Sequence, residues 1–89
     1  MPIISTFFGI VITMYFFDNR RHQMPHIHVK AEGEEAVITI PDGTVIQGSL
    51  RANKLKLAQA WVEIHQDELM RCWDLAIAGK PIFSIEPLR

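Results

Sequence analysis

Three of the four histidines of this 89-residue chain fall within seven residues, at His22, His26 and His28. If the chain is extended from His26 onward, His26 and His28 project from the same face of a strand, because strand side chains alternate. His22 lies in the preceding loop and can fold back over them. Three imidazoles with a water molecule make a catalytic zinc site, and iron, nickel and copper accept the same donors. The spacing predicts a candidate site for a divalent transition metal such as zinc, with a fourth ligand from Asp18, Glu32 or His65.

The same stretch has two other interpretations. It is also a basic cluster, because Arg20, Arg21 and Lys30 lie beside the histidines. Such a cluster suits phosphate contacts to a phosphodiester, and imidazoles act as acids and bases near neutral pH. Histidine is also a good solvent-facing strand residue, and Pro25 explains the local chain direction without a metal. A metal site, a phosphate site and a solvated loop therefore all stay open.

Other reactive side chains have simpler explanations. His65 and Glu68, one helical turn apart, form either a proton-transfer pair or a surface hydrogen bond. Cys72 falls on an apolar helix stripe, which is typical of a packed thiol rather than a nucleophile. The sequence has neither a glycine-rich phosphate loop nor a serine-nucleophile motif. We therefore assign no catalytic residue and no organic cofactor.

The elements that position the histidines begin with an uncharged stretch over residues 1–17. Its branched and aromatic side chains predict a buried strand from about Gly9 to Phe17. The stretch is shorter than the ~20 residues that cross a bilayer, and no basic region precedes it as in a secretory signal. A short edge strand is predicted over Ile82–Ile85. Alternation and turn residues predict three more strands, at about His26–Glu32, Glu35–Ile40 and Thr44–Leu50, the last with a bulge at Gly48.

The second half of the chain has helical periodicity. No glycine or proline occurs from Ala52 to Ala78, and apolar side chains recur three and four residues apart. Trp61 and Trp73 widen this stripe and are expected in the core. The unbroken phase favours one long helix, straight or kinked. Because such a helix would be about 40 Å long, a break near His65, with Asp67 capping a second helix, is the alternative.

Composition limits the class of protein. Hydrophobic residues make up 48% and charged residues 21%, as in a globular protein, and 89 residues hold one domain, spanning 1–89. The formal net charge of −1 lacks the basic excess of a dedicated nucleic-acid-binding protein. The single cysteine precludes an internal disulfide and suits the reducing cytoplasm.

Four stretches stand out by their order and spacing: Met1-Pro2-x-Ile4-Ser5, Gly9-Ile10-Val11-Ile12 with Met14-Tyr15-Phe16, Pro25-His26-Ile27-His28-Val29, and Trp61-x-x-x-His65-x-Asp67-Glu68-Leu69 with Trp73. With them the chain resembles a small, uncharacterised bacterial family classed as a domain of unknown function. The further histidine that members of this family carry corresponds to His22. The resemblance implies a cytosolic prokaryotic protein with a small protein partner, because such genes often lie in toxin–antitoxin-like pairs. It implies no catalytic activity.

These observations predict a single α+β domain with a three- to four-stranded, mainly antiparallel sheet and a long C-terminal helix on one face. Ile27, Val29 and Ala31 should meet the helix stripe, whereas the face with His26 and His28 should be open or covered by another chain. The strand predicted over residues 9–17 is apolar on both sides, and one helix covers one face. We therefore expect a homo-oligomer, a homodimer first, or a complex with a small protein partner.

Two functions follow from these predictions. The first is a protein-binding component of a toxin–antitoxin-like pair, which needs a flat apolar surface. The second is a metal- or histidine-dependent enzyme acting on phosphodiesters or RNA, which needs converging histidines beside a concave pocket.

Overall fold

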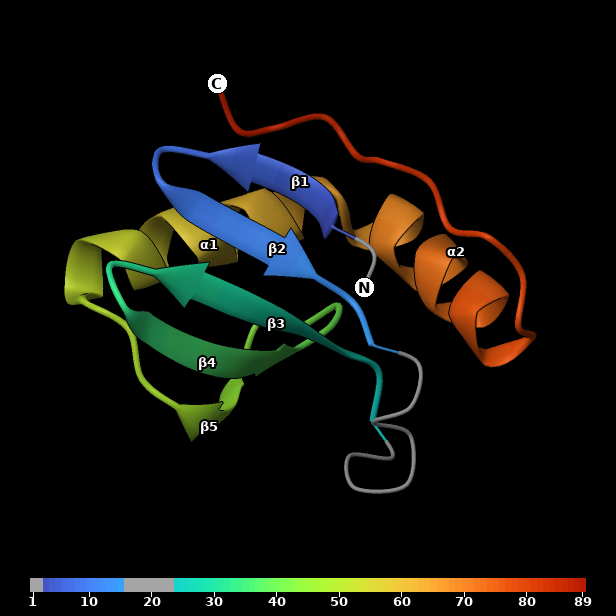
Figure 1. Cartoon of the computed structure of the whole chain (residues 1–89), viewed down its shortest axis with the longest axis horizontal. Coiled ribbons are helices and arrows are strands. Elements are labelled where there is room, and N and C mark those ends of the chain that lie inside the picture. Colours follow the sequence, from blue (N-terminus) through green and yellow to red (C-terminus); the bar gives the residue numbers. More distant parts are fainter. Residues whose placement is uncertain (1–2, 16–23) are drawn as a thin grey trace.

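The computed structural model describes residues 3–15 and 24–89, which form five strands and two helices (Figure 1). The elements are β1 (Ile3–Phe7), β2 (Ile10–Thr13), β3 (His26–Ala31), β4 (Glu34–Thr39), β5 (Val45–Gly48), α1 (Ala52–Ile64) and α2 (Gln66–Ile77). Neighbouring strands are antiparallel, and their order in the sheet is their order along the chain. Both helices lie on the same side of the sheet (Figure 1). The predicted α+β class with an antiparallel sheet is thus confirmed.

The uncharged N-terminal stretch forms a hairpin instead of the single strand predicted from Gly9 to Phe17. β2 covers Ile10–Thr13 only, and β1 pairs with it at the edge. In the described residues the sheet therefore has five strands rather than three or four. The turn consists of Phe8 and Gly9, which both have positive φ angles, of 48° and 76°. Two positive angles give a two-residue turn whose twist matches the strands, so the apolar run folds back on itself.

The central strand, β3, agrees with the prediction for its helix-facing side. Ile27, Val29 and Ala31 are all buried in the core, as the two-residue period requires. β2 and β4 flank β3 on either side. The core is completed by the apolar stripe of the two helices: Ala58, Trp61, Val62, Leu69, Cys72, Trp73 and Ala76.

The single long helix was the wrong choice of the two alternatives. α1 ends and α2 begins at His65, whose φ and ψ of −112° and 29° lie outside the helical region. The longest dimension of the backbone is 33 Å, shorter than the roughly 40 Å of an unbroken helix. A break at this point lets both halves pack against the sheet. The cap residue is His65 rather than Asp67, which lies in the first turn of α2 and complements its dipole there.

The segment after α2 is not the edge strand predicted over Ile82–Ile85. It runs back beside α2 towards β1 (Figure 1) and makes a single backbone hydrogen bond there, from the Ile85 N–H to the Ile4 carbonyl, at 2.8 Å. The Ile85 side chain is buried in the core, and the Trp61 indole N–H donates to the Glu86 carbonyl at 2.8 Å. The segment thus closes the core beside β1. Neither of the two helices found in the described residues is long and apolar enough to cross a membrane.

β5 forms the other edge of the described sheet. The irregularity in its pairing falls at Ile46, between the pairs Val37–Gln47 and Ile38–Val45, rather than at Gly48 as predicted. Gly48 has a different constraint, because its φ is +75° and a β-carbon there would lie 2.2 Å from the Glu35 carbonyl oxygen. Glycine is needed at this position for the close approach of β4.

Candidate functional site

The outer face of the sheet, which we define as the face opposite the helices, carries the side chains of greatest chemical interest. Val11 lies opposite Lys30, and Lys30 lies opposite Glu35. In the neighbouring row His28 lies between Thr13 and Val37. Cross-strand partners project from the same face, so these rows place a lysine, a glutamate and a histidine within one patch.

His28 is held in a fixed orientation on this face. Its Nδ1–H donates to Glu35 Oε2 at 3.0 Å, and its side chain is only 12% exposed. The Tyr15 ring meets the imidazole edge-on, with ring centres 4.5 Å apart. A carboxylate and an aromatic ring therefore fix both the position and the plane of the His28 imidazole.

His26 projects from the same face but is buried within its own chain, which corrects the prediction that the face with both histidines is open or covered by another chain. Its Nδ1–H donates to the Met24 carbonyl at 2.8 Å, and its ring centre lies 5.1 Å from that of Trp73. Trp73 belongs to α2, which extends beside the end of the sheet where β3 begins (Figure 1). Alternation places His26 on the outer face, but it does not show that a helix also covers this end of the sheet.

The hydrogen bonds of the two histidines define their tautomers. The Glu35 carboxylate and the Met24 carbonyl are acceptors only, so each Nδ1 must carry the proton. In the neutral imidazoles the lone pair then lies on Nε2. The ring centres of His26 and His28 are 5.5 Å apart. The sheet therefore brings together two imidazoles of the same tautomer, which can act as bases or as metal ligands.

The structure brings together only part of the predicted metal set. His22 and Asp18 lie outside the described residues. Glu32 forms an ion pair with Arg51 at 3.3 Å, and the His65 Nδ1–H donates to Glu68 Oε1 at 2.6 Å. Across residues 3–15 and 24–89, no group of three histidine, cysteine or acidic side chains is arranged to hold a metal ion.

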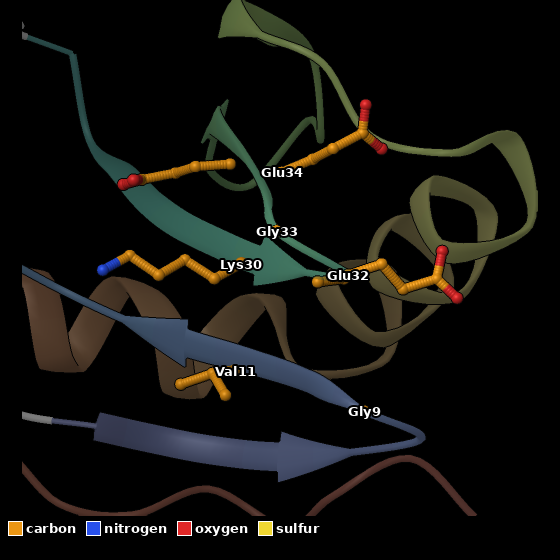
Figure 2. A pocket seen from close by; sticks show the side chains of 8 residues that line it. Gly9, Val11, Lys30, Glu32, Gly33 and Glu34 are labelled. Carbon is orange, nitrogen blue, oxygen red and sulfur yellow. The ribbon is translucent and has the colours of Figure 1, made fainter.

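Of the three predicted phosphate contacts, the structure describes only Lys30. Arg20 and Arg21 lie outside the described residues, whereas Lys30 is exposed on the outer face. Lys30 lines an open hollow of about 370 Å³ that reaches from Gly9 and Val11 to the turn at Gly33. Figure 2 shows the Lys30 side chain extending in one direction and the Glu32 carboxylate in the opposite one. Because these charged groups diverge, the hollow does not focus charge on one small ligand.

Cys72 is confirmed as a core residue. It is buried in the helix stripe, and its thiol donates to the Phe83 carbonyl at 3.5 Å. Burial raises the pKa of the thiol, so the reactive thiolate is disfavoured at neutral pH. Trp61 and Trp73 are also buried in the core, as predicted.

The most informative residue missed by the sequence analysis is Glu35. The strands predicted from the sequence end at Glu32 and begin again at Glu35, which leaves Glu35 at the edge of a turn. In the structure only Glu32 and Gly33 form the turn, with φ angles of 51° and 79°, and Glu34 already belongs to β4. The two-residue turn pairs Lys30 with Glu35 and places Glu35 diagonally across from His28. The sequence signal for this two-residue turn was the Glu32-Gly33 pair between two strands of alternating polarity.

Comparisons with known proteins give one match. A search of the curated proteins and a search of the solved structures found nothing similar to the chain. A family model described as a domain of unknown function, DUF4160, matches residues 9–74. The matched region covers more than half of the chain and includes β2 to β5, both site histidines and almost all of the two helices. The chain belongs to the DUF4160 family of domains of unknown function.

Proposed function

We propose that this chain is a protein-binding component of a toxin–antitoxin-like pair in the bacterial cytoplasm, and that its small protein partner docks on the outer face of the sheet. The pairing is suggested by the family resemblance of the sequence. The observation that carries the docking site is the unequal covering of the sheet, because both described helices pack on one side. Thr13, His26, Val37 and Thr39 of the outer face are buried. The part that stays exposed, from Ile3 to Lys30 and Glu35, is the surface offered to a partner.

The outer face has the mixed composition expected of such a surface. Ile3 is 56% exposed, and Val11 and Tyr15 are half-buried. Lys30 and Glu35 contribute charges that can fix the register of a partner, whereas the apolar side chains contribute buried area. No other helix or strand of the described residues lies over these side chains.

The proposal is tested by co-expressing the chain with the product of the adjacent gene and measuring co-purification. Val11→Lys adds a charge to the outer face, and we expect it to weaken the complex at least about tenfold, since an unpaired charge in an interface is costly. Ile64→Lys is the matched control, because Ile64 is 63% exposed on α1, on the opposite side of the sheet. This control should bind as the unchanged chain does.

Light scattering of the chain alone completes the test. A mass near the 10.2 kDa of one chain would leave the outer face to a distinct partner and set aside the homodimer expected from the sequence. A dimer that Val11→Lys dissociates would instead assign the outer face to a second copy of the chain and contradict a distinct partner. Equal co-purification of the Val11→Lys and Ile64→Lys variants would place the docking surface elsewhere.

A second candidate function, histidine-dependent cleavage of phosphodiesters, is favoured by the pairing of His28 with Glu35. A carboxylate on Nδ1 makes Nε2 the basic nitrogen, and the neighbouring Lys30 can contact a phosphate. If His28 is a general base, His28→Gln should lower the rate of RNA oligonucleotide cleavage by about 10²–10⁴-fold. His65→Gln removes the other histidine–glutamate pair and should leave the rate unchanged. Absence of cleavage, or equal rates in both variants, would exclude this function.

A further inference from the structure

We infer that Phe8, in the turn between β1 and β2, is an anchor residue that inserts into an apolar pocket with an acidic rim on the small protein partner. This inference rests on the proposed function and extends its docking surface from the outer face to the turn. Three features of the turn carry it: the exposure of the Phe8 side chain, the backbone conformation of Phe8 and the positive charge beside it.

Phe8 is exposed although its neighbour in the chain is a core residue. Phe7 is buried, and its ring centre lies 5.5 Å from that of Trp61. The Phe8 ring meets the Phe7 ring edge-on, with ring centres 6.4 Å apart, but Phe8 remains 55% exposed. Aromatic side chains are enriched in the buried centre of protein interfaces. The chain therefore presents to solvent a side chain of the type that protein partners bury.

The backbone conformation of Phe8 is unfavourable for phenylalanine. Its φ of 48° lies in the left-handed region, where a β-carbon meets the following carbonyl oxygen. Two-residue turns of this kind favour asparagine followed by glycine, and only the second position, Gly9, fits that preference. Neither burial nor conformation thus favours the Phe8 side chain in the free chain. Backbone strain of this kind is concentrated at functional positions, which supports a role in binding.

Lys54 of α1 holds the turn in place and adds a positive charge to it. Its ammonium group donates a hydrogen bond to the Phe8 carbonyl. Among the residues that the structure describes, Lys54 takes part in no ion pair. A carboxylate beside the partner's pocket can accept from the other donors of this ammonium group, and the charge therefore specifies an acidic rim.

The turn is continuous with the proposed docking surface. Gly9, which follows Phe8, lines the open hollow of about 370 Å³ together with Val11 and Lys30. Figure 2 shows Val11 and Lys30 on the neighbouring strands β2 and β3, with Gly9 at the end of the first hairpin. A partner that covers Val11 and Lys30 therefore reaches the turn without a gap and can enclose Phe8.

The test uses Phe8→Asn, which removes the ring and gives the turn its favoured Asn-Gly sequence. We expect the affinity for the product of the adjacent gene, measured by calorimetry, to fall about 10–100-fold, because half of an aromatic side chain is no longer buried in the complex. The midpoint of thermal unfolding of the chain alone should rise by about 2–5 °C, because asparagine is favoured at this position of the turn. Opposite changes in binding and stability distinguish an anchor residue from one that supports the turn.

Two further variants complete the set. Ile77→Asn is the matched control, because Ile77 at the end of α2 has a similar exposure of 49%, and this variant should bind as the unchanged chain does. Lys54→Gln removes the charge but keeps a donor for the Phe8 carbonyl, and it should weaken binding about three- to tenfold.

The outcomes separate this inference from the proposed function. If Val11→Lys weakens the complex but Phe8→Asn binds as the unchanged chain does, the outer face is the docking surface and the anchor is overturned. A lower unfolding midpoint in Phe8→Asn, or an equal loss of affinity in Ile77→Asn, would also overturn it. Unchanged binding by Lys54→Gln would refute the acidic rim. If the unchanged chain does not bind the partner, the proposed function and the inference both fail.

Discussion

At the scale of single residues, two histidines on one strand face occupy different environments, and this difference affects stability. His26 is buried beside Trp73, whereas His28 is partly exposed and bonded to a half-exposed Glu35. We expect His26→Ala to cost about 2–4 kcal/mol of unfolding free energy because it leaves a cavity. His28→Ala should cost about 1 kcal/mol, since an ion pair with a half-exposed carboxylate contributes little. Val29→Asp buries an unpaired charge in the core and should cost several kcal/mol.

Chemical denaturation of the three variants measures these free energies. A larger loss in His28→Ala than in His26→Ala would contradict the environments described for the two rings. Val29→Asp as stable as the unchanged chain would refute the orientation of β3 itself.

The sequence was sufficient to predict which way these side chains project, but not what they touch. Alternation along β3 places Ile27 and Val29 opposite His26 and His28, as the structure confirms. The contact of His26 with Trp73 joins residues far apart in the chain and depends on where α2 lies beside the end of the sheet. The contact with Glu35 was missed because strand bounds at Glu32 and Glu35 give a different cross-strand register from the observed pairing of Lys30 with Glu35.

At the scale of elements, Gly33 and Gly48 have nearly the same φ but different surroundings. Comparing them distinguishes the cost of a left-handed backbone from the cost of a steric clash. Gly33 has a φ of +79°, and a β-carbon there would meet nothing within 4 Å, whereas a β-carbon at Gly48 would lie 2.2 Å from the Glu35 carbonyl oxygen. Gly33→Ala should therefore cost only the roughly 1–2 kcal/mol of a left-handed conformation. Gly48→Ala also displaces β4 or β5 and should cost roughly 2–5 kcal/mol.

Thermal or denaturant unfolding of both variants is the measurement, with Gly33→Ala as the matched control. Equal losses would mean that the backbone of Glu35 does not approach Gly48 as closely as described. Because Glu35 also orients His28, the Gly48→Ala variant should disturb the His28 imidazole resonances, whereas Gly33→Ala should not.

Two of the wrongly predicted elements contain a break that the local sequence does not mark. The N-terminal apolar run has no internal proline or charge to mark its turn at Phe8 and Gly9, so its composition alone favours a strand that begins at Gly9. The helical phase continues through His65, and the break is seen only in the folded chain, where His65 leaves the helical region. Periodicity reports which face of an element each residue lies on, and it does not report where the chain turns back on itself.

At the scale of the whole molecule, the additional strand changes how the apolar surface is distributed. β1 does not cover the outer face; it widens the sheet at the edge next to β2. Ile85, from the last part of the chain, closes the core between that edge and the helices instead. β1 and the last part of the chain thus add to the sheet edge and to the core on the helix side. Neither covers Val11 and Tyr15, which stay half-buried on the outer face.

The order of the strands has a consequence for how the molecule opens. β3 is hydrogen-bonded along both sides and packed on the core, whereas β5 is short and lies at the edge. Local opening transitions begin at such edges, so the amide protons of β3 should exchange with solvent only in the most global openings. His26 and His28 are carried on that strand. Their two imidazoles therefore keep their mutual position while the periphery of the sheet fluctuates, and a ligand meets an arrangement that already exists.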